Sequence, residues 1–369
     1  MRYVSGVDGG GSRTACLVAD ETGRLLGYGS GGPVNTNYVV RQEAVSSLQH
    51  AVDGALREAR LTGEHVETMC LSAPMAPDAV EEVAGRRGVR RVIRAAEGET
   101  PRWAARFWIE GHVGVTVDAG TGSMARGWSR EGREAGAGGW GATLGDEGSG
   151  YWIGLRAMIA ILQAHDGRIA DTGLTGPVLA HFGMADVLDM VFRASQGLAP
   201  NAGAGRPIRV APDSGAAATG REPSTGGMVF RTHSSERGPL TRAQVASLCP
   251  VVVGVARQGD WKAVEILEDA GIELGRLALA VIARLGMQED RFAVVPFGGV
   301  FRAGELVLRP FGEAVKAAAP RAEVVRPHFE PVVGAVLLAL DALGVSIDGR
   351  VRAAIEHSAS LFPSCRVER

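Results

Sequence analysis

Two stretches of the chain follow one pattern and decide the fold. Residues 6–27 read GVDGGGSRTACLVADETGRLLG, and residues 114–134 read GVTVDAGTGSMARGWSREGRE. Each begins with a β-branched strand that ends in aspartate, at Asp8 and at Asp118. A glycine-rich turn with a serine follows, then a second short strand and a Gly-Arg turn, which predicts a hairpin of two strands. A repeat after about 110 residues is too long for a solenoid and predicts two similar lobes.

The segments between and after the repeats alternate in type. Apolar residues recur at helical spacing over 44–59, whereas 66–71 and 91–93 have the composition of strands. Strands that alternate with helices predict a mainly parallel, buried sheet, and hence an α/β protein. Further helices are predicted at 79–84, 151–164, 242–256, 261–285 and 332–343, and a further strand at 294–297.

The 369 residues suit two domains at roughly 100–200 residues per domain. We expect an N-terminal lobe over 1–112, joined by the C-terminal segment 332–369, and a C-terminal lobe over 113–331. Residues 197–238 are rich in Gly, Ala, Pro, Ser and Thr and lack apolar periodicity. That composition predicts a flexible insertion in the C-terminal lobe.

Composition and charge exclude several classes of partner. The formal net charge of −2 gives no reason to expect a nucleic acid or a membrane surface. No apolar run reaches the roughly 18 residues that span a bilayer, and the strand pattern begins too early for a signal peptide. The four scattered cysteines form no CxxC pair, which suits free thiols in a reducing compartment. We expect a cytoplasmic protein, and the sequence leaves its oligomeric state open, a homodimer included.

The first glycine turn has the composition of a phosphate-binding loop. Glycines let backbone N–H groups approach phosphate oxygens, and hydroxyl side chains add further donors. Asp8, at the end of the strand, is suited to hold Mg²⁺ through water. An ordinary glycine-rich hairpin is the alternative interpretation of this turn alone. The candidate phosphate ligands here are Gly9, Gly10, Gly11, Ser12 and Thr14.

The second turn repeats this design with Gly120, Thr121, Gly122 and Ser123. Two such loops, one per lobe, could clamp a triphosphate from both sides. Phosphoryl transfer needs mainly positioning and charge neutralisation, so facing loops with a metal ion suffice for it. The pair of loops therefore favours a site for ATP and Mg²⁺.

Two further glycine-rich segments complete the set of motifs. Gly138-Gly139-Trp140-Gly141 and then Gly145 to Gly150 surround Asp146 and Glu147, directly before an apolar helix. These carboxylates suit a binding site. The alternative is that Ser149 only caps the helix and that Asp146 and Glu147 are only favourable charges at its N-terminus, although capping needs just one such residue. Gly298 and Gly299 end a strand and permit flat contact with a ring such as adenine.

Taken in order, these motifs resemble those of the N-acetylglucosamine kinases and their relatives, the BadF/BadG/BcrA/BcrD-type ATPases. The matching segments are GVDGGGSRT, GPVN, AGTGS, GGWGATLGDEGSGYWIG and FGGV, followed by Val333-Gly334-Ala335. The resemblance implies the two-lobed ribonuclease-H-like fold of the sugar kinase/Hsp70/actin superfamily, with duplicated βββαβαβα lobes and ATP in a central cleft. It makes the two turns phosphate-1 and phosphate-2 loops and FGGV the adenosine loop.

The resemblance also implies an acceptor site and exposes one departure. Asn35 and Asp146 match positions that contact the sugar in the kinases, and we add Gly139 and Glu147 beside them. The kinases carry a catalytic aspartate shortly after the strand before the second lobe, but residues 92–99 read VIRAAEGE and contain none. We therefore assign the general base to Glu97 or Glu99.

The function expected from these features is ATP-dependent phosphorylation of an amino sugar, an N-acetylglucosamine-like small molecule. Two alternatives stay open. An ATPase activator of the BadF type would hold an iron–sulfur cluster through paired cysteines, which this chain lacks. A non-catalytic sensor of sugar or nucleotide is favoured by the missing aspartate.

Overall fold

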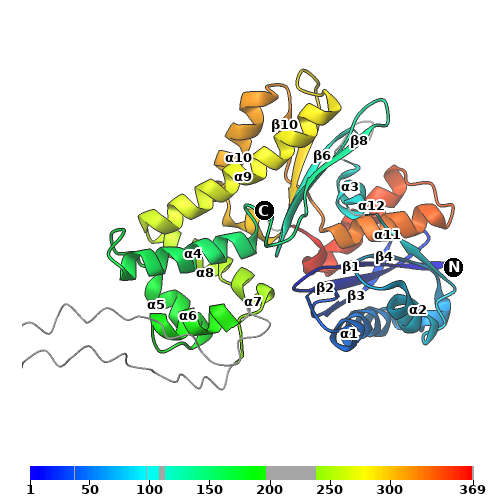
Figure 1. Ribbon diagram of the computed structural model, residues 1–369. Helices are drawn as coiled ribbons and strands as arrows, with labels where there is room; N and C mark the ends of the chain where they lie inside the picture. Colours follow the sequence, from blue (N-terminus) through cyan, green and yellow to red (C-terminus); the bar gives the residue numbers. More distant parts are fainter. Residues whose placement is uncertain (37, 97, 108–112, 197–237, 368–369) are drawn as a thin grey trace, which may run out of the picture.

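The computed structural model has two lobes, each built around a five-stranded sheet (Figure 1). It describes residues 1–36, 38–96, 98–107, 113–196 and 238–367. Glu97 and the expected insertion 197–238, apart from Gly238, lie outside the described residues.

The first sheet has the strand order β3-β2-β1-β4-β5. The first repeat forms the antiparallel pair β1–β2, in which Asp8 lies opposite Ala15, and β3 extends the pair antiparallel to β2. β4 and β5 add to the other side in parallel. The strands are β1 (Tyr3–Gly9), β2 (Thr14–Asp20), β3 (Leu25–Gly31), β4 (Val66–Ser72) and β5 (Arg91–Arg94).

The second sheet repeats this order as β8-β7-β6-β9-β10. The second sequence repeat forms its antiparallel pair β6–β7, β8 follows antiparallel, and β9 and β10 add in parallel. The strands are β6 (Gly114–Ala119), β7 (Ser123–Trp128), β8 (Glu134–Gly138), β9 (Ala293–Phe297) and β10 (Glu323–Val324). The prediction of a duplicated, two-lobed α/β fold is confirmed.

Helix α1 (Arg41–Ala59) lies directly on β3 because that strand has glycine at every second position. A Cβ atom at Gly27, Gly29 or Gly31 would come within 2.2 Å of a carbonyl oxygen of α1. No real side chain tolerates that distance, so the three glycines let the helix backbone touch the strand. Glycine therefore serves helix–strand packing in this chain as well as the turns.

The opposite face of the first sheet is covered by α11 (Pro331–Ala342), which packs on β1 (Figure 1). Its contact with helix α3 (Glu99–Ala105) is equally close, since a Cβ at Gly334 would lie 1.8 Å from the Thr100 carbonyl oxygen. Thus α11 joins the sheet and α3 in one core. Also in this lobe are α2 (Pro77–Gly85), α12 (Gly349–Ser358) and the 3₁₀ turns at 63–65, 359–361 and 363–365.

The second lobe carries most of the helices (Figure 1). Its longest is α9 (Trp261–Leu285), which begins where the Asp260 side chain accepts a hydrogen bond from the Ala263 N–H and ends at Gly286, with φ +70°. The others are α4 (Gly150–His165), α5 (Thr175–Phe182), α6 (Val187–Gln196), α7 (Arg242–Ala246), α8 (Cys249–Arg257) and α10 (Glu305–Ala318).

The single helix predicted at 242–256 is wrong, because the structure has α7 and α8 there with a break at Ser247 and Leu248. Pro250 supplies the reason. Its ring would clash with the Ala246 carbonyl in a continuous helix, and it has no N–H to donate. The break places α7 at the mouth of the cleft described below.

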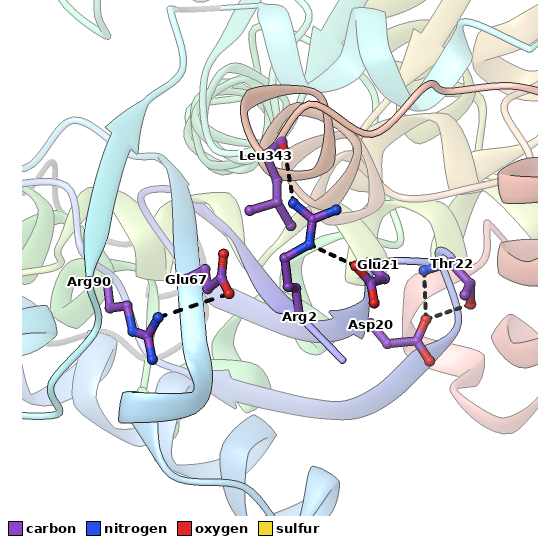
Figure 2. A network of polar contacts seen from close by, with 7 residues as sticks. All are labelled: Arg2, Asp20, Glu21, Thr22, Glu67, Arg90 and Leu343. Carbon is purple, nitrogen blue, oxygen red and sulfur yellow. Dashed lines mark hydrogen bonds and ion pairs between the residues drawn. The ribbon is translucent and has the colours of Figure 1, made fainter.

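The end of the first hairpin away from the glycine turn carries a small polar network (Figure 2). Arg2 donates to the Glu21 carboxylate at 2.7 Å and to the Leu343 carbonyl at 3.3 Å. Asp20 accepts from the N–H and hydroxyl of Thr22 and so closes the turn into β3. Within the described part of the chain, no helix combines the length and hydrophobicity that a membrane crossing demands.

Candidate active site

A cleft of about 1010 Å³ opens between the two lobes. Both glycine turns, the end of β9 and the start of α11 line it, together with α7. Most predicted site residues are brought together here. They are Asp8, Gly9, Gly10, Gly11, Ser12, Asn35, Gly120, Thr121, Gly122, Ser123, Gly139, Asp146, Gly298 and Gly299.

The two predicted phosphate loops meet across the cleft. The hydroxyls of Ser12 and Thr121 share a hydrogen bond of 2.5 Å, although 109 positions separate them in the chain. Each turn is closed by a backbone hydrogen bond, from Gly10 N–H in the first and from Gly120 N–H in the second. The duplicated hairpins thus present their turns to one point.

The glycines of the site have two distinct roles. A Cβ atom at Gly10, Gly120 or Gly299 would meet no atom within 4 Å, so these positions leave the cleft open. In contrast, a Cβ at Gly9 would lie 2.4 Å from the Val34 side chain. Gly298 has φ +101° and touches the Ala119 backbone, so it too is fixed by packing.

The hydroxyls of Thr14, which begins β2, and of Ser123, which begins β7, both donate hydrogen bonds within the protein. Thr14 is buried and donates to the Gly32 carbonyl at 2.8 Å, outside the residues that line the cleft. Ser123 donates to the Glu147 carbonyl at 2.7 Å, and Glu147 itself does not line the cleft. Of the four predicted hydroxyl ligands, Ser12 and Thr121 are therefore the two whose side chains face across it.

Asp8 is the second-last residue of β1 and lines the cleft. Its carboxylate accepts a hydrogen bond from the Thr100 hydroxyl at 3.0 Å. The pKa of Asp8 is raised to about 6, chiefly by burial and also by the nearby Glu330 carboxylate, while the Thr100 hydrogen bond and the Arg13 charge act against this shift. Asp118, the equivalent residue of the second hairpin, also lines the cleft.

Asp146 is almost completely buried and forms an ion pair with Arg242. Its carboxylate also accepts a hydrogen bond from the Ser123 N–H at 3.2 Å, and its own φ is +61°, an uncommon conformation for a residue with a side chain. Burial raises the pKa of Asp146, and the Arg242 charge opposes that shift. Ser149, for which the sequence left an N-cap role open as an alternative, does cap α4, since its side chain accepts from the Trp152 N–H.

Glu330 is a site residue that the sequence did not reveal. This nearly buried carboxylate accepts from Arg13 of the first turn at 3.1 Å and from Arg302, which follows β9, at 2.9 Å. It therefore links the two lobes within the lining of the cleft. Arg242 and Thr100 were also missed. These three residues belong to no motif, and only long-range contacts bring them to the cleft.

Glu99, one of the two predicted bases, is the first residue of α3 and does not line the cleft. Its carboxylate accepts from the Arg102 guanidinium at 3.2 Å and from the Trp103 indole N–H at 3.1 Å. A role as base would require Glu99 to leave these partners. Glu97, the other predicted base, lies outside the described residues.

Two sheets of the same strand order, with glycine turns that meet over one cleft, define the two-lobed fold of the actin-like ATPases and sugar kinases. The chain belongs to the BadF/BadG/BcrA/BcrD ATPase family, which it matches over residues 5–339. Membership of this family implies the use of ATP.

Several proteins with kinase names or titles are similar to this chain over nearly their whole length. The N-acetylmuramic acid/N-acetylglucosamine kinase of Clostridium acetobutylicum is 26% identical over 92% of this chain and 98% of its own. The N-acetyl-D-glucosamine kinase of Dictyostelium discoideum is 25% identical over 91% and 97%. A Chromobacterium violaceum structure described as an N-acetylglucosamine kinase has a TM-score of 0.62 at 25% identity, over 92% and 99%.

Proposed function

We propose that this protein transfers a phosphoryl group from Mg-ATP to a hydroxyl of an amino sugar of the N-acetylglucosamine type. One observation carries the proposal: the turns of the two repeats meet at the Ser12–Thr121 contact, in a cleft lined by both lobes. Loops that converge in this way can hold one polyphosphate from two sides. The names of the similar kinases support the choice of acceptor.

The residues divide the work of positioning. Gly10 and Gly120 leave room for phosphate oxygens beside backbone N–H groups, and Gly299 leaves room for the base of the nucleotide. Asp8 and Asp118 end equivalent strands and suit Mg²⁺, which proteins commonly hold through one or two carboxylates and substrate phosphates. The bound Mg²⁺ would supply neutralisation of phosphate charge.

Asn35, Gly139 and Asp146 form the acceptor end of the cleft in this proposal. The acceptor proton needs a base, and Glu97 and Glu99 remain our candidates, with Asp146 next. A base contributes about 10²–10⁴-fold, which is less than the positioning effects together. Modest transfer therefore survives even a poorly placed base.

A second candidate function is sensing, in which the protein binds sugar and nucleotide with little transfer. The observation that favours it is the chain after β5, where Ala95 and Ala96 carry no carboxylate and Glu99 is engaged by Arg102 and Trp103. An activator with a shared iron–sulfur cluster is disfavoured, since Cys16, Cys70, Cys249 and Cys365 are all buried in hydrophobic clusters. The cytoplasmic location and the homodimer stay predictions.

Release of ADP in the presence of N-acetylglucosamine tests the kinase function. We expect release that depends on both sugar and Mg²⁺, with sugar phosphate formed in equal amount. Release of ADP without sugar phosphate would contradict the proposal. Tight binding of both ligands with no release would instead establish the sensor.

A further inference from the structure

Thr100 brings a buried hydroxyl to the cleft from outside both glycine hairpins. It is the second residue of α3, it is only 1% exposed, and it lies among the residues that line the cleft. Its hydroxyl donates a hydrogen bond to Oδ1 of Asp8 at 3.0 Å, across 92 positions of the chain. The proposed function gives Asp8 a task and Thr100 none.

The two partners of this hydrogen bond are supported by one helix, α11. A Cβ atom at Gly6, two positions before Asp8 in β1, would lie 2.4 Å from the Val336 backbone nitrogen of α11. A Cβ at Gly334 of α11 would lie 1.8 Å from the Thr100 carbonyl oxygen. The backbone of α11 therefore touches β1 and α3 directly, close to both partners. This close packing, and not a flexible loop, sets the separation of the two side chains.

The hydrogen bond from Thr100 uses one oxygen of the Asp8 carboxylate. Among the described residues, no other donor forms a hydrogen bond with that carboxylate, so Oδ2 is available to a ligand. Threonine is branched at Cβ, and its side chain has few rotamers to choose from. A carboxylate that is held through one oxygen by such a side chain presents its other oxygen in a fixed direction.

The Thr100 hydroxyl differs from the other buried hydroxyls near the glycine turns in the group that accepts its hydrogen bond. Thr14 and Ser123 donate to backbone carbonyls, which suits a purely structural role. Thr100 donates to a carboxylate that lines the cleft. Hydrogen bonds of this kind orient metal-binding side chains, and their removal typically costs about 10–100-fold in metal affinity.

We propose, on the basis of the proposed site for Mg-ATP, that Thr100 is a positioning residue for Asp8: it holds Oδ1 and so orients Oδ2 for the Mg²⁺ that accompanies the nucleotide. Thr100 acts through Asp8 and touches neither the metal ion nor the phosphates. Its effect is therefore on nucleotide binding that depends on Mg²⁺, and it requires no sugar.

Thr100→Ser and Thr100→Ala form a matched pair, because the two new side chains differ only in the hydroxyl. Calorimetric binding of ADP with and without Mg²⁺ is the measurement. With Mg²⁺, we expect the Kd for ADP to stay within about threefold of the parent in Thr100→Ser and to rise at least about 10-fold in Thr100→Ala. Without Mg²⁺, the three proteins should bind ADP alike. Equal Kd values for the two variants in Mg²⁺ would overturn the inference.

Thr100→Val removes the hydroxyl and keeps the branched shape, so it replaces Thr100→Ala if the smaller side chain prevents folding. We expect the same loss of at least about 10-fold. Thr116→Val is the matched control, since Thr116 is also fully buried and its hydroxyl has no hydrogen-bond partner among the described residues. The control should bind ADP and Mg²⁺ like the parent. An equal loss in both valine variants would show an effect on folding and overturn the inference.

The background Asp8→Asn tests whether Thr100 acts through the carboxylate. In that background, Thr100→Ala should change the Kd for ADP in Mg²⁺ less than about twofold, because the group that Thr100 positions is already lost. A further 10-fold loss would show that Thr100 acts elsewhere and would overturn the inference.

The absence of sugar from these measurements separates the inference from the kinase function. If ADP binding shows the expected dependence on Mg²⁺ and Thr100 but no sugar phosphate forms in the kinase assay, the inference holds and transfer to the sugar fails. If sugar phosphate forms and the Thr100 variants bind ADP like the parent, the kinase function holds and the inference fails. Binding of ADP by the parent that is indifferent to Mg²⁺ would overturn both.

Discussion

The two glycine hairpins share their architecture but differ in what surrounds them. In β1–β2 and in β6–β7 the strand ends in or beside an aspartate, and a backbone hydrogen bond closes the turn. Around the first hairpin, Asp8 receives a hydrogen bond from Thr100, and Arg13 reaches Glu330. Around the second, the Ser123 N–H donates to Asp146, which pairs with Arg242.

This difference shows which part of the site is duplicated. In the proposed function the two turns, which follow one pattern, hold the phosphates with backbone groups. The residues that we propose for the acceptor, Asn35, Gly139 and Asp146, come from segments outside the two hairpins. Specificity for the acceptor is then expected to depend on residues outside the duplicated turns.

The largest expected effect tests whether the two turns are equivalent. Gly10→Val and Gly120→Val each place a side chain in the open cleft, where a Cβ meets no protein atom within 4 Å. We expect each to lower ATP turnover at least about 100-fold with little change in Tm, because phosphate positioning is lost. Gly85→Val, at an equally open position on the surface of α2, is the control. A loss of ATP turnover in only one of the two variants would show that the turns are not equivalent.

The next effect belongs to the first hairpin and depends on pH. Because burial raises the pKa of Asp8 to about 6, the folded protein binds this proton more tightly than the unfolded chain. Its ionisation therefore destabilises the fold progressively from about pH 4 to pH 6, and the cost persists above that range. Asp8→Asn should stabilise the protein by on the order of 1–3 kcal/mol at pH 8 and have little effect at pH 4.

Thermal unfolding of the parent and of Asp8→Asn from pH 4 to pH 8 measures this difference in stability between the two proteins. Activity is the second readout, since the same substitution removes the proposed Mg²⁺ ligand and should abolish turnover. A difference in Tm between the two proteins that does not change with pH would show that the pKa of Asp8 is not raised by folding.

A smaller effect is expected at the bridge between the lobes. Glu330→Gln keeps the shape of the side chain and removes the charge that Arg13 and Arg302 share. Both arginines are about half exposed, so we expect a loss of about 1 kcal/mol in chemical denaturation, and not the 3–5 kcal/mol of a fully buried pair. The pH range over which ionisation of Asp8 lowers the stability should also move to lower pH, because the Glu330 charge contributes to the raised pKa of Asp8. If that pH range is the same in Glu330→Gln as in the parent, the Glu330 charge does not act on Asp8.

The smallest effect is expected at the far end of the first hairpin. Arg2→Ala removes the surface contact with Glu21 shown in Figure 2. Exposed ion pairs are screened by water, so Tm and activity should equal those of the parent within error. A clear drop in Tm would show that this network supports the hairpin as strongly as the turn does.

The repeat and the helical periodicity were sufficient to predict most of the fold. The predicted bounds of 261–285 match α9, since Asp260 caps a long amphipathic stretch that Gly286 ends. Periodicity failed at α7 and α8, where one proline outweighed the apolar pattern. It also gave no sign of β10, which has only two residues and depends on its pairing with β9.

The candidate site was predictable where glycine turns mark it and not elsewhere. A glycine turn carries its candidate binding residues within seven consecutive positions, as at Asp8 to Thr14. The ion pair of Arg242 with Asp146 spans 96 positions, and that of Glu330 with Arg13 spans 317. No local pattern encodes such pairs, because the fold alone brings the partners together.

The contact between Ser12 and Thr121 has a kinetic consequence. If ATP binds between the two turns, as we propose, the 2.5 Å hydrogen bond between these hydroxyls must break to admit it. Each catalytic cycle would then include one separation of the loops to admit ATP and another to discharge ADP. The frequency of that opening sets an upper limit on kcat, however fast the chemical step is.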